Sequence, residues 1–239
     1  MLFDWKSLVI LDGEFPHRDV TQGKDPLSYG AVSLDSPNPK TWFYGEAHLS
    51  SDVGVEPPTE GDIGSLAVAG FTHEMAYNPK RPNAKELLTA LLDWRANMQN
   101  GGVFACQNNL DLTYLENSAR RWGIPFPKGL YRIVDLHTLA FVYLIGNHAR
   151  LNEDPALTKK IKLSNHGTSQ LGLPVIGLMV GVEVDRYRQT AHNALVDAVV
   201  SAEITHRLIN SGQPLFSNLN DAVVIANAMV VEYRARFED

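Results

Sequence analysis

The chain has 239 residues, which is enough for one large domain or two small ones. Hydrophobic residues make up 44% and charged residues 20%, so we expect a folded core and not a disordered chain. The net charge of −6 excludes the global positive field of a protein that coats long duplexes, although a local basic groove is compatible with it. One cysteine excludes an internal disulfide bond and fits a reducing compartment. The apolar stretches are too short for a signal peptide or a membrane span, so we expect a cytoplasmic protein without membrane contact.

Short apolar runs separated by turn-forming residues fill much of the first half of the sequence and predict a strand-rich sheet. The predicted strands cover residues 8–11, 29–34, 41–44, 47–49 and 103–106. Pro, Gly and acidic residues crowd the segment 53–64, where we expect a surface loop. Leucines at helical spacing predict a helix over residues 84–98, and a second helix begins near Asp111 and ends at Gly123.

The second half is dominated by helical patterns. We predict a helical stretch that follows Ile133 and continues through Ile145, and two further helices over residues 194–209 and 219–237. A polar connecting loop is expected over residues 146–162. The sequence contains no internal repeat and no linker rich in Pro, Gly or Ser, so we expect residues 1–239 to form a single domain. The chain begins with predicted strands, and strands and helices alternate after them. This order predicts an α/β fold with a mixed central sheet flanked by helices.

The most informative motif is Asp12-Gly13-Glu14, which directly follows the apolar run of residues 8–11. Side chains alternate along a strand, so Ile10, Asp12 and Glu14 share one face. Two carboxylates aimed together repel each other unless a cation lies between them, and hard oxygen ligands suit Mg²⁺ or Mn²⁺. The motif alone is common, and its meaning depends on further ligands elsewhere in the chain.

Two later segments supply candidate ligands. Asp111 follows the strand 103–106 at a strand-to-helix junction, and Asp197 lies five residues after His192. Five steps around a continuous α-helix rotate by about 140°, so this histidine and aspartate would diverge on one helix. They converge if His192 lies in the loop or first turn and Asp197 on the helix itself.

In this order and spacing, the motifs resemble those of the DEDD exonucleases of the His-containing, DnaQ-like subgroup (DEDDh). The resemblance covers residues 7–209, and residues 219–237 form an extra C-terminal helix beyond it. The segment 133–139 resembles the strand and helix that precede the third motif in that family. The segment 162–174 resembles the family's short helix and Leu-Gly-x-Pro turn.

The resemblance implies a ribonuclease H-like fold and an enzyme that removes nucleoside 5′-monophosphates from the 3′ end of single-stranded DNA or RNA. It also implies two Mg²⁺ or Mn²⁺ ions about 3.5–4 Å apart that clamp the attacking and leaving oxygens. By analogy Asp12 bridges both ions, Glu14 and Asp197 complete the nucleophile-side site, and Asp111 holds the second ion through water. His192 would take the proton from the attacking water as a general base.

Two further residues are candidate substrate contacts. Phe15 directly follows the first motif, where family residues approach the terminal base, and an aromatic ring stacks on any base. The family often places His-Asn before the second-motif aspartate and Phe next to it, whereas this chain has Cys106, Gln107 and Leu110 there. Gln107 keeps an amide that can bind backbone or substrate. The insertion 174–187 is long for a minimal family member.

Other interpretations stay open at this point. Asp12 and Glu14 can be exposed acids at a strand end, Asp111 a helix N-cap, and His192 with Asp197 a surface pair. These readings must all hold at once, which makes them the weaker account. A non-catalytic nucleic-acid-binding or assembly module with the same fold is the main alternative, and an endonuclease is the third. The sequence does not separate DNA from RNA substrates, and it leaves the oligomeric state open, a homo-oligomer included.

Overall fold

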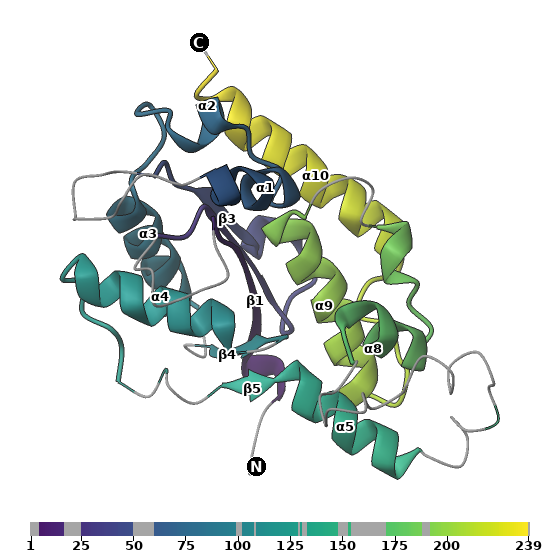
Figure 1. The fold of residues 1–239 in the computed structure, drawn as a ribbon. Helices are drawn as coiled ribbons and strands as arrows, with labels where there is room; N and C mark the ends of the chain where they lie inside the picture. Colours follow the sequence, from purple (N-terminus) through teal and green to yellow (C-terminus); the bar gives the residue numbers. More distant parts are fainter. Residues whose placement is uncertain are drawn as a thin grey trace.

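The computed structural model gives the fold of the protein and is drawn as a ribbon in Figure 1. The structure describes residues 5–16, 25–49, 60–98, 102–107, 109–128, 130, 133–147, 153, 171–187 and 192–238. The predicted loop 146–162 and the predicted short helix and turn of 162–174 lie largely outside these residues. Within the described part, no helix is long and apolar enough to cross a membrane.

Among the described residues, a five-stranded mixed sheet forms the centre of the fold, with the strand order β3-β2-β1-β4-β5. The strands are β1 (Leu8–Glu14), β2 (Ser28–Ser33), β3 (Phe43–Glu46), β4 (Val103–Cys106) and β5 (Val134–Asp135). β1 is antiparallel to β2, and β2 is antiparallel to β3, whereas β1, β4 and β5 run parallel. The prediction of an α/β fold with a mixed central sheet is therefore confirmed.

Helices cover both faces of this sheet (Figure 1). One face packs against α5 (Leu136–Gly146), α8 (Leu173–Met179), α9 (Ala194–Ile209) and α10 (Leu219–Ala235). The opposite face packs against α3 (Ala84–Ala96) and α4 (Leu110–Arg121). A smaller apolar cluster lies around α1 (Glu60–Val68) and α2 (His73–Ala76). Short 3₁₀ turns occupy Trp5–Ser7, Pro39–Thr41 and Val184–Arg186.

The alternation of side chains along β1 divides the two cores. Leu8 and Ile10 are buried in the cluster that contains α9, whereas Val9 and Leu11 are buried against α3 and α4. This alternation follows from the pleat of a strand, in which successive side chains point to opposite faces. Continued along β1, it places Asp12 and Glu14 on the side of α9, as the sequence predicts.

Local sequence signals explain where the principal helices begin. Asn83 caps α3 in a capping box: its side chain accepts the Glu86 N–H at 3.0 Å, and its own N–H donates to the Glu86 carboxylate at 2.8 Å. Asn193 caps α9 by accepting the N–H groups of Leu195 and Val196. These caps satisfy backbone donors that the first turn of a helix leaves unpaired.

Three predicted elements differ from the structure. The expected strands 41–44 and 47–49 are replaced by one strand, Phe43–Glu46, after a 3₁₀ turn whose N-cap is Asn38. His48 forms only an isolated bridge with Asn83. The prediction of a loop over residues 53–64 is wrong from residue 60 onward, where α1 begins. Its glycines and acids are typical of a loop, but tertiary packing stabilises a helix there. Residues 53–59 lie outside the described residues.

Candidate functional site

The end of β1 carries the first two acids of the site. Glu14 is buried and Asp12 is half-buried, and both follow the apolar residues of the strand on the α9 side. Between them, the Gly13 N–H donates to Asp111 Oδ1 at 3.1 Å. This hydrogen bond holds the first turn of α4 against the end of β1, so the Asp111 carboxylate lies beside the motif that the sequence singles out.

A glycine on the neighbouring strand lets α9 approach the sheet. Gly30 pairs with Asp12 across β1 and β2. A Cβ atom at Gly30 would lie 2.4 Å from the carbonyl of Ala194 and from the Cα of Leu195, closer than real Cβ contacts occur. The first turn of α9 therefore rests directly on the backbone of β2, next to Asp12, and brings Asp197 toward the acids of β1.

His192 and Asp197 converge because they lie on different elements. His192 precedes the N-cap Asn193, and Asp197 lies within the first turns of α9. His192 Nδ1 lies 3.3 Å from Asp197 Oδ2, and the histidine side chain is 43% exposed whereas that of the aspartate is 2% exposed. The expectation that the two residues meet with His192 outside the helix is confirmed. The imidazole is therefore partly exposed to solvent, whereas the carboxylate that it contacts is buried.

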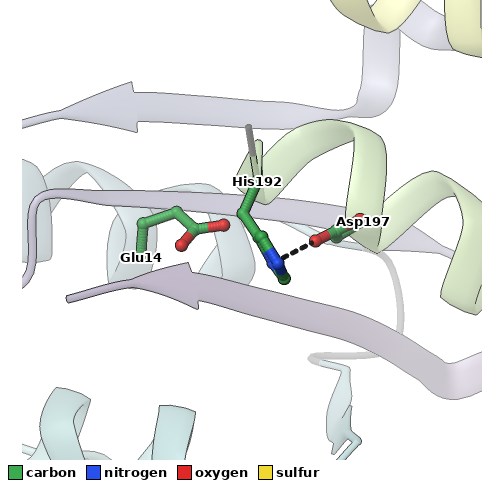
Figure 2. A group of neighbouring side chains, drawn as sticks. All are labelled: Glu14, His192 and Asp197. Carbon is green, nitrogen blue, oxygen red and sulfur yellow. Dashed lines mark ion pairs between the residues drawn. The ribbon is translucent and has the colours of Figure 1, made fainter. Parts of the chain in front are cut away.

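Three of the predicted residues form one compact group, shown in Figure 2. Glu14, His192 and Asp197 each offer a ligand atom, and these atoms all lie within 4.8 Å of one another. The Glu14 carboxylate comes from β1 and points toward the imidazole, which contacts Asp197 on its other side (Figure 2). Two carboxylates and an imidazole at this spacing can hold a divalent cation.

Asp111 lies outside this group of three but interacts with it electrostatically. It is the second residue of α4 and is buried, while Asn109 occupies the N-cap, so the N-cap interpretation of Asp111 is wrong. Burial raises the pKa of Asp111 to about 7; the Gly13 N–H opposes this shift, and the negative charge of Asp197 adds to it. The Asp111 carboxylate therefore lies close enough to Asp197 for the charge of Asp197 to raise the pKa of Asp111.

The remaining predicted residues are not members of the group of three. Asp12 is not among the three side chains that meet. Burial raises the pKa of the Cys106 thiol, and the negative charges of Asp111 and Asp12 add to this shift. Phe15 is half-buried, with its ring stacked on that of Tyr114 at a centroid distance of 4.0 Å. Gln107 is half-buried directly after β4.

Two residues that the sequence does not single out help to position the elements that carry the site residues. Gly30 permits the approach of α9, and the Tyr29 hydroxyl donates to the backbone carbonyl of Asp111 at 3.0 Å. The signal available in the sequence is their position on β2, opposite the Asp12-Gly13-Glu14 motif, but it becomes visible only when the register of β1 and β2 is known. Strand register depends on non-local packing, which one sequence does not reveal.

No protein-family model matches the sequence, and the comparison with curated proteins finds no match either. Among solved structures, the fold is similar to the nuclease domain of 3'hExo, a DEDDh family member, in a crystal structure bound to rAMP. The TM-score is 0.53 at 13% sequence identity, and the match covers 86% of this chain and 92% of that domain. The protein therefore has the ribonuclease H-like fold of a DEDDh nuclease domain, as the motifs predict.

Proposed function

We propose that the protein is a metal-dependent 3′→5′ exonuclease that acts on single-stranded DNA or RNA and releases nucleoside 5′-monophosphates. The observation that carries this proposal is the meeting of Glu14, His192 and Asp197 at one point, although about 180 residues separate the first from the others. The similarity in fold to the nuclease domain of a DEDDh family member supports it. The reaction direction and the substrate come from the motif resemblance.

The donor set fits hard divalent cations. In the proposal Asp12, Glu14, Asp111 and Asp197 are the ligands of two Mg²⁺ or Mn²⁺ ions, which would stabilise the charge on the attacking and leaving oxygens. The raised pKa of Asp111 supports this assignment, since a buried carboxylate next to Asp197 is costly without added positive charge. Carboxylate oxygens are the ligands that Mg²⁺ and Mn²⁺ prefer.

His192 is the proposed general base. When its Nδ1–H donates to Asp197, the lone pair of Nε2 is left to take a proton from the attacking water. The water oxygen forms a bond to the phosphorus of the last phosphodiester, and the bond from phosphorus to the 3′ oxygen breaks. The products are a nucleoside 5′-monophosphate and a strand that is one nucleotide shorter, whose 3′ oxygen takes up a proton.

Phe15 and Gln107 are the proposed substrate contacts. The ring of Phe15 is held by stacking on Tyr114 and by an edge contact with Tyr29, so a base that stacks on it meets an immobilised surface. Stacking of this kind contributes about 1–3 kcal/mol per base and does not depend on base identity. Gln107, at the end of β4, offers an amide to the nucleotide backbone.

A digestion experiment tests the proposal. Oligonucleotides of DNA and RNA with a 5′ label, single- and double-stranded, are incubated with Mg²⁺ or Mn²⁺ and with a chelator. We expect stepwise shortening of single strands from the 3′ end, release of 5′-monophosphates, and complete loss of digestion with chelator. No shortening with either metal would contradict the proposal, and binding without turnover would favour the non-catalytic module.

A comparison of two single histidine variants tests the role of His192 in this experiment. We expect His192→Ala to lower the rate by about 10²–10⁴-fold, the usual contribution of a general base. The control is His73→Ala, since His73 is exposed on α2 and contacts the Tyr77 ring. Equal rates for these two variants would remove His192 from the mechanism.

A further inference from the structure

The backbone of His192 is anchored to a helix that contributes none of the predicted site residues. The His192 N–H donates to the carbonyl oxygen of Val68 at 2.8 Å, and Val68 is the last residue of α1. This hydrogen bond fixes the backbone of His192, which directly precedes the N-cap of α9, relative to Asp197. The position of the imidazole therefore depends on where the C-terminus of α1 lies.

The way α1 ends explains why this carbonyl is available. The Phe71 N–H donates to Leu66 O at 2.9 Å, and the Gly70 N–H donates to Ala67 O at 3.1 Å. Gly70 has a positive φ of 72°, which glycine adopts without strain. This is a Schellman ending, in which the two bonds use the carbonyls of Leu66 and Ala67. The carbonyl of Val68 projects beyond them and accepts from His192.

Phe71, which closes this ending, is clamped by two arginines. Its side chain is buried, and the guanidinium carbons of Arg234 and Arg81 lie 5.1 Å and 5.9 Å from the centre of its ring. Cations over an aromatic face at this distance attract the ring. Both guanidiniums also bind the carboxylate of Glu46 at the end of β3, with Arg234 Nε 2.7 Å from Glu46 Oε1. The ring is thus held by groups that are themselves fixed to the sheet.

Arg234 connects this clamp to the C-terminal helix. It lies in the last turn of α10, and its neighbour Tyr233 donates a hydroxyl to the Glu46 backbone carbonyl at 3.3 Å. Burial lowers the pKa of Arg81, and the neighbouring guanidinium of Arg234 lowers it further because the two cations repel each other. Both cations pair with the one carboxylate of Glu46. α10 therefore reaches the end of α1 through Arg234 and Phe71.

We propose that Arg234 is a positioning residue for His192, acting through Phe71 and the carbonyl of Val68. The catalytic role of His192 in this statement rests on the proposed function. A displacement of about 1 Å of a catalytic group costs up to about 100-fold in rate, so a small shift at the end of α1 matters. The C-terminal helix, which lies beyond the motif-bearing part of the chain, thereby contributes to the geometry of the site.

The kinetic test compares Arg234→Gln with Arg236→Gln, since Arg236 lies on the same helix end and pairs with Glu232 at the exposed surface. We expect Arg234→Gln to lower kcat by about tenfold with KM nearly unchanged, and Arg234→Lys to restore part of the loss. In the His192→Ala background, Arg234→Gln should cause no further loss. An equal loss in both backgrounds would overturn the proposal, because the arginine would then act elsewhere.

A second readout does not need activity. We expect the backbone amide of His192 to be protected from hydrogen exchange in the unaltered protein and in Arg236→Gln, and to exchange at least about tenfold faster in Arg234→Gln. Unchanged protection in Arg234→Gln would overturn the positioning role. If the unaltered protein digests no oligonucleotide, the proposed function fails, and the exchange rates alone decide whether Arg234 holds the His192 backbone.

Discussion

Two buried glutamates lie in one row of the sheet and have opposite surroundings. Glu14 on β1 pairs with Ser28 on β2, which pairs in turn with Glu46 on β3. Residues paired across strands point to the same face, so both carboxylates face α9 and α10. Glu14 is 8% exposed and Glu46 is 0% exposed.

The groups that these two acids contact differ in charge. Glu46 binds two guanidiniums, those of Arg81 and Arg234. Glu14 lies instead beside the carboxylate of Asp197 and the imidazole of His192. A buried charge is tolerated when an opposite charge and hydrogen bonds compensate it. The chain supplies that compensation to Glu46 as part of the fold, whereas the group around Glu14 is suited to a cation from solution.

Replacing the glutamate of the site should give the largest effect. We expect Glu14→Gln to lower nuclease activity by roughly 10³-fold or more, the scale on which a principal electrostatic stabiliser contributes. The folded state should keep its stability in the presence of a chelator, because the variant removes one negative charge beside Asp197. Kinetics and urea denaturation measure the two effects, and a large loss of stability with normal turnover would reverse our assignment.

The matching change at β3 should act on stability. We expect Glu46→Gln to lower the free energy of unfolding by about 3–5 kcal/mol, since it leaves two arginines without their carboxylate. Urea denaturation measures this, with Glu232→Gln as the control. That exposed glutamate pairs with Arg236, so its loss should cost less than about 1 kcal/mol. Similar stabilities for the two variants would show that the buried cluster is not a structural element.

A smaller loss is expected where α9 meets the sheet. Gly30→Ala places a methyl group 2.4 Å from the Ala194 backbone, so the first turn of α9 must move. We expect a loss of about 1–3 kcal/mol in stability, together with a fall in kcat because Asp197 moves with the helix. Gly64→Ala is the control, because its added methyl group meets no atom within 4 Å. An unchanged kcat in Gly30→Ala would show that activity does not depend on the close approach of α9 to β2.

Asp111 gives the smallest expected change in stability, and this change depends on pH. Its pKa is about 7 in the folded protein against 3.8 as the usual value, so its contribution to stability falls as pH rises from about 4 to about 7. In chelator at pH 8, we expect Asp111→Asn to raise the melting temperature by roughly 5 °C, while activity is lost. At pH 4 the variant and the unaltered protein should melt together. A lower melting temperature at pH 8 would mean that a charged Asp111 is stabilised by its surroundings.

The parts of this structure that could be predicted are those specified by local sequence. The bounds of β4 (Val103–Cys106) and α9 (Ala194–Ile209) equal the predicted ranges, since turn residues and an Asn cap mark their ends. The face shared by Ile10 and Glu14 follows from strand alternation alone.

The features that could not be predicted depend on contacts between distant segments. α1 carries glycines and acids, and its stability comes from packing around Phe71, which no local pattern indicates. The hydrogen bond from His192 to Val68 joins residues more than 120 positions apart. The closeness of α9 to Gly30 likewise appears only once the strands are paired.

The most direct test of the cation site is anomalous diffraction from crystals soaked in Mn²⁺. We expect Mn²⁺ density between the carboxylates of Glu14 and Asp197, with Asp12 and Asp111 turned toward it and with His192 at its solvent side. The same soak of Glu14→Gln should show weaker density or none. Crystals that take up Mn²⁺ at other positions while this point stays empty would contradict the account.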